Sequence, residues 1–423
     1  MPHRLLRSVR LAFAAVLMSA PAAFGATAST SGGVLTYSLN NSADQTVTFS
    51  GSSSDKIVTL TDTTGVARAF GSDCSAISPN QVQCGNISSV VTDTGAGDDN
   101  VDASGLTGIP ISVTDNARST NGAQTFRGGT ADDTITDLST YQAGGYENVY
   151  GGPGNDTLTG AYTQYVRLHG DAGNDVLKTA VNGTNGGFVQ FDGGVGIDRV
   201  DFGGSTQAVD VNLADQTARV VGQASQYLQP LGNNEAVSGT SGNDLLSGSS
   251  AANVLAGSGG DDALSGADGN DFLAGGAPDD ATTQKDVLNG GNGSDTVTFS
   301  YLTAANGVNV TLDGAANDGD SSLPGGLGAP ATGAANASNV RNDVERVNGT
   351  NQGDTLSAAA LTGQVGVTLV GNGGIDTLTG SPFADFLDGG PETTNTLDCG
   401  AGSDSYRISS QGVPPQTNCE NGI

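Results

Sequence analysis

One short phrase of sequence recurs along this chain and constrains its fold more than any other feature. It reads glycine, glycine, any residue, glycine, any residue, aspartate, any residue, aliphatic residue, and good copies occupy 151–158, 193–200, 266–273 and 290–297. The glycines permit a tight turn with positive φ, and the aspartate places a carboxylate at the end of that turn. The aliphatic residue begins a short strand and points inward. A turn rich in carbonyl and carboxylate oxygens, stacked on copies of itself, is typical of a calcium site.

The spacing of the copies predicts an all-β solenoid, which grows by stacking coils and not by enlarging one core. Residues 239–274 are four tandem nonapeptides, GTSGNDLLS, GSSAANVLA, GSGGDDALS and GADGNDFLA. Between Asp133 and Asp198 the intervals are 23, 19 and 23 residues, which indicates coils of two half-turns that keep the turn on one edge. The sixth position of the phrase is held by Asp99, Asp133, Asp156, Asp175, Asp198, Asp244, Asp262, Asp271, Asp295, Asp354, Asp376, Asp385 and Asp404.

The charge of the chain favours cations as partners. It has 44 acidic against 15 basic residues and a formal charge of -29. Nucleic acids and anionic membrane surfaces need cationic patches, so this balance argues against both.

The first residues have the features of a secretory signal. Three arginines precede a short apolar run at 11–18 and a stretch of small residues, so we expect residues 1–26 to be a cleaved signal peptide. The apolar run is too short to span a bilayer, and no other transmembrane segment is expected. An exported chain meets an oxidising compartment, so we expect two local disulfides, Cys74–Cys84 and Cys399–Cys419. The alternative, a thiol metal site, lacks any Cys-x-x-Cys spacing.

Composition divides the chain into four expected parts. Residues 27–94 are β-rich with polar turns and predict a small N-terminal cap, because the end of a solenoid exposes strand edges. Residues 95–405 form the repeat region, with inserts at about 203–238 and 299–348, and residues 406–423 form a C-terminal cap or tail that contains Cys419. The stretches 198–247 and 295–357 share the same order of motifs, which indicates an internal duplication.

These repeats resemble the RTX, or hemolysin-type, calcium-binding nonapeptide repeat, in the arrangement of secreted bacterial multi-repeat proteins. The resemblance covers roughly residues 95–405 and implies a parallel β-roll in which two nonapeptides make one right-handed coil. It also implies several calcium ions between stacked turns, held by the sixth-position carboxylates named above. Turn carbonyls would come from Gly152, Gly154, Gly173, Gly194, Gly196, Gly269, Gly291 and Gly293. The expected N-terminal signal and two cysteine pairs depart from the many family members that leave the cell by an uncleaved C-terminal signal, and the copy at 248–256 has Asn253 in place of aspartate.

Calcium also follows from the repeats without the resemblance. Equivalent aspartates on neighbouring coils would stand roughly 4.8 Å apart, where like charges repel. A cation between the turns reverses that interaction, so we expect metal binding to be linked to folding. The competing interpretation is a glycine-turned solenoid whose aspartates merely cap turns, but a fixed aspartate in so many copies favours calcium.

No catalytic motif is present, and the alternatives to a structural or surface-interaction role have little support. Tyr165, Arg167 and His169 alternate along one predicted strand and are the candidate cluster for a polyuronate lyase or epimerase. The simpler interpretation of these three residues is a solvated outer face. An adhesin or matrix protein that contacts cell-surface glycans or other extracellular proteins is the third possibility.

Overall fold

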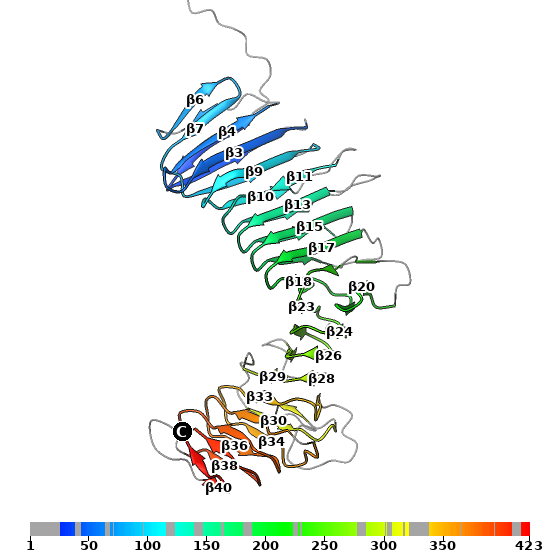
Figure 1. Cartoon of the computed structure of the whole chain (residues 1–423). Helices are drawn as coiled ribbons and strands as arrows, with labels where there is room; N and C mark the ends of the chain where they lie inside the picture. The colour runs from blue at the N-terminus through cyan, green and yellow to red at the C-terminus, as the bar shows by residue number, and fades with distance from the viewer. Residues whose placement is uncertain are drawn as a thin grey trace, which may run out of the picture.

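The chain is built from parallel strands stacked into one elongated solenoid, whose coils follow sequence order from the blue to the red end (Figure 1). The computed structural model describes residues 26–38, 44–63, 68–70, 72–95, 97–115, 123–138, 147–161, 165–180, 188–222, 227–228, 231–276, 285–300, 302, 307–315, 318–320, 338–363, 365–392, 394–407 and 416–423. The expected signal peptide lies outside these residues, apart from Ala26. Within the described part of the chain, no helix is long and apolar enough to cross a membrane.

One sheet runs the full length of the solenoid and forms a common face. From β2 to β41 its neighbouring strands pair in parallel, and β1 joins β2 in the antiparallel sense. In spatial order its strands are β5 (Arg68–Phe70), β1 (Thr27–Ser31), β2 (Val34–Ser38), β8 (Ser89–Asp93), β10 (Ile111–Asp115), β12 (Thr134–Asp137), β14 (Thr157–Gly160), β16 (Val176–Thr179), β18 (Arg199–Asp201), β23 (Ala236–Ser238), β25 (Val254–Ser258), β27 (Phe272–Gly276), β29 (Thr296–Thr298), β33 (Arg346–Asn348), β35 (Thr368–Val370), β37 (Phe386–Asp388), β39 (Ser405–Tyr406) and β41 (Asn421–Gly422).

Three shorter sheets complete the coils in succession. The first contains β6 (Cys74–Ser78), β7 (Gln81–Cys84), β4 (Ile57–Asp62), β3 (Thr46–Ser52), β9 (Asn100–Thr107), β11 (Thr125–Arg127), β13 (Glu147–Pro153), β15 (Tyr165–Ala172), β17 (Phe188–Val195) and β22 (Leu231–Gly232). The second contains β21 (Tyr227–Leu228), β20 (Thr217–Val220), β19 (Val209–Asn212), β24 (Leu245–Ser247), β26 (Ala263–Gly269), β28 (Val287–Gly293) and β32 (Asn339–Val340). The third contains β31 (Gly319–Asp320), β30 (Val308–Thr311), β34 (Thr355–Ser357), β36 (Thr377–Thr379), β38 (Thr396–Asp398) and β40 (Gln416–Thr417).

The expected all-β parallel roll is therefore correct. In the tandem block, β24 pairs with β26 and β25 pairs with β27, so alternate nonapeptides lie on opposite faces and two make one coil. The two duplicated segments occupy equivalent places in the solenoid. In the first, β19 pairs with β24, and in the second β30 pairs with β34 in the same parallel sense. Antiparallel pairing is concentrated at the N-terminal end, where β3, β4, β7 and β6 form a meander.

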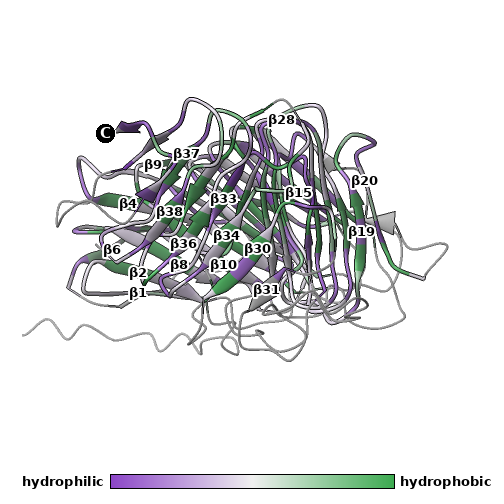
Figure 2. Cartoon of the chain, turned by 90° about the horizontal axis from the view of Figure 1, so that it is seen from below, coloured by the Kyte–Doolittle hydropathy of each residue, from purple (hydrophilic) through white to green (hydrophobic). Residues whose placement is uncertain are grey.

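Rows of aliphatic and aromatic side chains, in register from coil to coil, form the core. In the long sheet Ile135, Leu158, Leu177 and Val200 stand in register, and all four are fully buried. In the first short sheet Phe126, Val149, Leu168 and Phe191 do the same. Alternation along each strand puts one side chain inside and the next outside, which gives the mixed green and purple bands of Figure 2.

Candidate metal-binding turns

The sixth-position aspartates are inside the solenoid and not on its surface. Asp156 lies two residues before the core residue Leu158, and the two-residue period of a strand therefore turns both side chains inward. Asp156 is 1% exposed and Asp198 is 0% exposed. Burial of a charged carboxylate is unfavourable unless hydrogen bonds or a cation compensate it.

One carboxylate oxygen, Oδ1, joins each coil to the coil before it. The backbone N–H of Asp133 donates to Oδ1 of Asp156 over 2.7 Å, and the N–H of Asp156 donates to Oδ1 of Asp175 over 2.7 Å. The same bond recurs between stacked turns beside all three short sheets, and beside the second and third of these sheets it occurs on both edges of the solenoid. Further members are Asp175 to Asp198, Asp244 to Asp262, Asp262 to Asp286, Asn253 to Asp271, Asp271 to Asp295, Asp354 to Asp376, and Asp385 to Asp404.

The other oxygen, Oδ2, is different in nine of these aspartates. It is buried and accepts no hydrogen bond from any residue that the structure describes. The nine are Asp99, Asp156, Asp175, Asp198, Asp262, Asp271, Asp295, Asp376 and Asp404. We call the six-residue turns that end at these aspartates the open turns. A buried anionic oxygen without a donor is unfavourable and needs either a proton or a cation.

The pKa values of these carboxyl groups express that need. Burial, followed by repulsion from Asp133 and Asp175, raises the pKa of Asp156 to about 8 against the lowering effect of its backbone hydrogen bond. Burial likewise raises the pKa of Asp262 to about 8 and the pKa of Asp376 to about 7, and neighbouring carboxylates add to both shifts.

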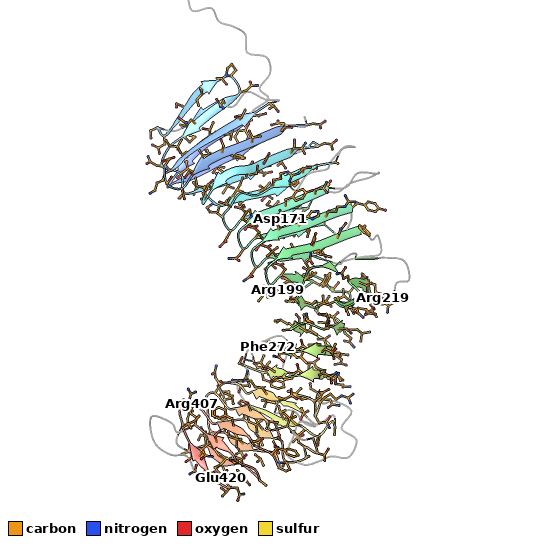
Figure 3. All side chains as sticks on the ribbon, in the orientation of Figure 1. Asp171, Arg199, Arg219, Phe272, Arg407 and Glu420 are labelled. Carbon is orange, nitrogen blue, oxygen red and sulfur yellow. A yellow bond between two sulfur atoms is a disulfide. The ribbon has the colours of Figure 1, made fainter. Side chains whose placement is uncertain are left out.

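The backbone of the open turns takes a conformation that places several carbonyl groups around the carboxylate. In all nine, the second and fourth residues have positive φ, as at Gly152 (96°) and Gly154 (145°). The second position tolerates other residues, because Asp171 (Figure 3), Ser258, Ala267 and Asn372 also have positive φ. All eight glycines predicted as carbonyl ligands lie at these two positions: Gly152, Gly154, Gly173, Gly194, Gly196, Gly269, Gly291 and Gly293.

The first glycine of an open turn keeps space beside the free oxygen. A Cβ at Gly151 would lie 2.2 Å from Oδ2 of Asp156, and a Cβ at Gly266 would lie 2.1 Å from Oδ2 of Asp271. Seven of the nine open turns have glycine at this position, and the turns that end at Asp99 and Asp404 have Thr94 and Cys399 there. Carboxylate and carbonyl oxygens around a small interior space match the hard-oxygen ligand set of calcium. Among the described residues no group of three or more His, Cys, Asp or Glu side chains is placed to hold a metal ion.

Four of the predicted aspartates, Asp133, Asp244, Asp354 and Asp385, have both oxygens occupied by hydrogen bonds. Sequence reasoning also missed four acidic members of the hydrogen-bonded rows. Asp286 receives the N–H of Asp262, and glutamates receive the N–H of the last aspartates in the other rows. These are Glu235 with Asp198, Glu345 with Asp295, and Glu420 with Asp404. The duplication contains Glu235 and Glu345 at matching places, and that signal could have revealed them.

The candidate catalytic residues lie on the outer face of β15. The His169 ring stacks on Tyr150 with centroids 4.7 Å apart, and its Nδ1 lies 3.7 Å from Oδ2 of Asp192. Tyr165 is 47% exposed and stacks on Phe188 of β17. Alternation of β15 places Arg167 on this face as well.

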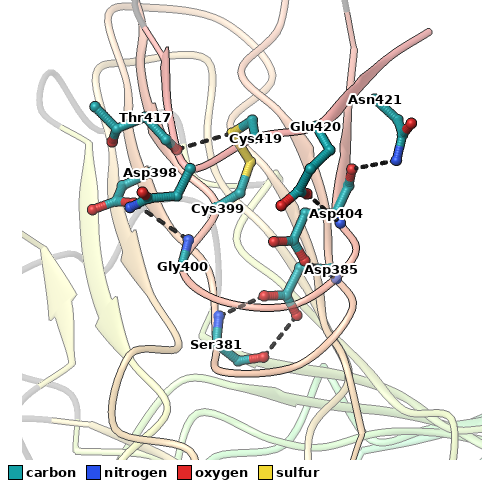
Figure 4. Close-up of a disulfide and its surroundings, with 11 residues drawn as sticks. Ser381, Asp385, Asp398, Cys399, Gly400, Asp404, Thr417, Cys419, Glu420 and Asn421 are labelled. Carbon is teal, nitrogen blue, oxygen red and sulfur yellow. Dashed lines mark hydrogen bonds between the residues drawn. A yellow bond between two sulfur atoms is a disulfide. The ribbon is translucent and has the colours of Figure 1, made fainter.

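Both predicted disulfides form. Cys74–Cys84 joins β6 to β7, and Cys399–Cys419 joins the last open turn to the C-terminal end of the chain (Figure 4).

Parallel coils with stacked glycine–aspartate turns define a β-roll of calcium-binding type. Comparison with protein families agrees, because four segments match the RTX calcium-binding nonapeptide repeat, at residues 144–161, 237–277, 280–299 and 370–406. The chain therefore contains RTX calcium-binding nonapeptide repeats, in four segments. No curated protein matches the chain.

Proposed function

We propose that the open turns bind several calcium ions and that this binding drives the folding of the solenoid. The observation that carries the proposal is the row of buried Oδ2 atoms, each facing glycine backbone and accepting no hydrogen bond within the described chain. In this proposal Asp156, Asp175 and the other open-turn aspartates each supply one carboxylate oxygen, and glycine carbonyls of the same and neighbouring turns supply the rest.

The same carboxylates oppose folding when no cation is bound. Asp133, Asp156 and Asp175 are linked directly by hydrogen bonds, and repulsion between neighbouring carboxylates is among the causes of the raised pKa of Asp156. A cation between successive turns replaces that repulsion with attraction. At a calcium concentration ten times the dissociation constant, each site would add about 1.4 kcal/mol to the free energy of unfolding. Extracellular modules often have dissociation constants of about 10⁻⁴–10⁻³ M.

An extracellular location fits this calcium requirement. Support comes from the expected signal at residues 1–26 and from two disulfides, which persist in oxidising compartments. We propose a structural or surface-interaction role for the secreted protein, with residues 27–94 and 406–423 as end caps of the repeat region at 95–405.

The test is a calcium titration of chelated protein, followed by far-ultraviolet circular dichroism and by calorimetry. We expect heat of binding at several sites and a cooperative rise in the β-sheet signal. The thermal unfolding midpoint should also rise with calcium concentration. Magnesium at equal concentration is the control, because it dehydrates reluctantly and seldom accepts sites built from protein oxygens alone. No binding heat and an unchanged spectrum would refute the proposal.

A second candidate is binding of an acidic polysaccharide on the outer face of the first short sheet. There the Arg127 guanidinium lies 4.1 Å above the Tyr150 ring, which stacks on His169 in the next coil. Aromatic faces beside cationic groups suit sugar rings with carboxylates. Replacement of Tyr150 and Arg127 by alanine should weaken polyuronate binding, measured by calorimetry, without changing calcium binding.

A further inference from the structure

Five turns of the solenoid differ from the open turns in the hydrogen bonds that their sixth-position side chain accepts. In each of them the backbone N–H of the second residue donates to the side-chain oxygen that is free in an open turn. The donors are Gly129 (2.5 Å, to Asp133), Thr240 (2.6 Å, to Asp244), Ser249 (2.6 Å, to Asn253), Thr350 (2.7 Å, to Asp354) and Ser381 (2.6 Å, to Asp385). We call 128–133, 239–244, 248–253, 349–354 and 380–385 the closed turns.

Side-chain hydroxyls complete four of the closed turns. Thr240, Thr350 and Ser381 each donate a hydroxyl hydrogen bond to the aspartate four residues later, over 3.0, 2.9 and 2.8 Å. Ser249 does the same to Asn253 over 3.1 Å. These hydroxyl bonds add to the backbone N–H bonds, so the sixth-position side chain of each of these closed turns has donors from within its own turn.

The backbone independently separates the two groups. All nine open turns have positive φ at their second and fourth residues, whereas none of the residues of the five closed turns has positive φ. Peptide carbonyls must therefore be oriented differently in the two kinds of turn.

Open and closed turns also differ in their position along the solenoid. We call a series of turns that stack directly on one another a run, and each closed turn is the first turn of a run. In four of them Oδ1 accepts the N–H of a residue at or next to the start of a strand, and not the N–H of another sixth-position residue. Oδ1 of Asp133, Asp244, Asp354 and Asp385 accepts the N–H of Ile111, Val209, Val308 and Val367. The fifth, at 248–253, stacks on the segment of Glu235. By contrast, eight of the nine open turns stand on a preceding turn. For example, a Cβ at Gly154 would lie 2.4 Å from the carbonyl oxygen of Ala131 in the closed turn below. The ninth, which ends at Asp99, stacks on the segment of Gln45.

Ser249 and Ser258 show that the segment beneath a turn, and not only the residue at its second position, separates open turns from closed turns. Both serines hold the second position of tandem nonapeptides. Ser249, above the Glu235 segment, is in a closed turn. Ser258 has φ of 80° in an open turn, and this turn stands on 239–244, since a Cβ at Gly260 would lie 2.5 Å from the carbonyl oxygen of Gly242. Figure 4 shows a whole short run: closed turn at Ser381–Asp385, open turn ending at Asp404, and Glu420 as acceptor at the end.

We propose that the closed turns are metal-free starting caps, and that calcium binds only from the second turn of each run onward. This inference rests on the proposed calcium function. Hydroxyl and amide donors take the place of a cation at the first turn, which has no glycine–aspartate turn beneath it. The carboxylates of Asp133, Asp244, Asp354 and Asp385 therefore build the run without binding an ion themselves.

The test compares neighbouring aspartates of one row by calorimetric calcium counting on the full chain. The variant Asp262→Asn should bind one calcium fewer than the parent protein, and its matched control Asp244→Asn should bind the same number. Asn253 already shows that asparagine is accommodated in a closed turn. Loss of an ion in Asp244→Asn would overturn the inference, whereas a parent protein that binds no calcium would overturn the proposed function instead.

Two further variants keep the test decisive if Asp244→Asn folds poorly. Asn253→Asp adds a carboxylate at a closed turn, and we expect it to leave the calcium count unchanged; one extra ion would contradict the inference. Thr240→Val should lower the thermal unfolding midpoint in chelator while leaving the calcium count unchanged. A drop in the count with no shift of that midpoint would mean that Thr240 serves a metal site and not a cap.

Discussion

At the scale of single residues, the two oxygens of the sixth-position aspartate have separate roles. Oδ1 of Asp175 accepts the N–H of Asp156 over 2.7 Å and fixes the distance between coils, while Oδ2 is held in the interior without a donor among the described residues. The glycines around it serve this arrangement, since the fourth position combines positive φ with close stacking. At Gly173 a Cβ would lie 1.6 Å from the carbonyl oxygen of Gly154.

Replacing Gly154 by alanine should therefore destabilise the solenoid by about 2–4 kcal/mol, because it combines an unfavourable φ with a steric clash. Gly222 is the matched control, since it has φ of 80° and no atom within 4 Å of a built Cβ. Gly222→Ala should cost only the backbone strain, about 1–2 kcal/mol. Denaturant unfolding in saturating calcium measures both, and equal losses would contradict tight stacking at the fourth position.

The raised pKa values predict an unusual dependence of stability on pH in chelator. The folded state holds protons on Asp156 and Asp262 more tightly than the unfolded chain, with pKa values of about 8 against 3.8. The stability that these protons provide is complete below pH 4 and is lost as the pH rises toward 8. We expect the thermal unfolding midpoint in chelator to fall between pH 5 and pH 8, and to rise over the same range in saturating calcium. A midpoint in chelator that rises with pH would mean that these carboxylates are already compensated without metal.

At the scale of strands and turns, much of the architecture could be predicted from the sequence because the repeat has a fixed chemistry. An aliphatic residue two places after the aspartate marks the buried position of each strand, as Leu158 does after Asp156. The nonapeptide period predicts the pairing of β25 with β27. The state of each turn could not be predicted in the same way. Ser249 and Ser258 occupy equal positions in their repeats, and they differ because of the coil beneath them. That coil is 14 residues earlier for Ser249, at Glu235, and 18 residues earlier for Ser258, at Thr240. Gly129 and Gly152 likewise share the glycine pair but lie in different kinds of turn.

The disulfide Cys399–Cys419 belongs to this scale, because it ties the last open turn to the end strands β40 and β41. In a stacked repeat each coil depends chiefly on its neighbours. Replacing both cysteines by serine should cost about 2–5 kcal/mol locally and should raise amide hydrogen exchange in β38 to β41 while β13 to β17 stay protected. The Cys74/Cys84 double variant is the control, and it should instead affect β6 and β7. Increased exchange throughout the chain would contradict local coupling.

At the scale of the whole molecule, one continuous sheet faces three shorter sheets in succession. A new row of turns begins where the second short sheet starts, and another where the third starts. The closed turns at 239–244 and 349–354 stand directly above β19 and β30, the strands that begin the two duplicated inserts. Glutamates at 235, 345 and 420 accept the N–H of the last aspartate in their rows. We therefore propose that the solenoid is a series of short metal-binding runs on the continuous sheet, each with a defined first and last turn.

The most direct test of this account is an anomalous difference map from crystals grown in millimolar calcium. The account predicts peaks beside Oδ2 in the eight open turns that stand on another turn, those of Asp156, Asp175, Asp198, Asp262, Asp271, Asp295, Asp376 and Asp404. It predicts no peak inside the turns of Asp133, Asp244, Asp354 and Asp385. A map with no peaks beside the open-turn carboxylates would contradict the calcium-binding account as a whole.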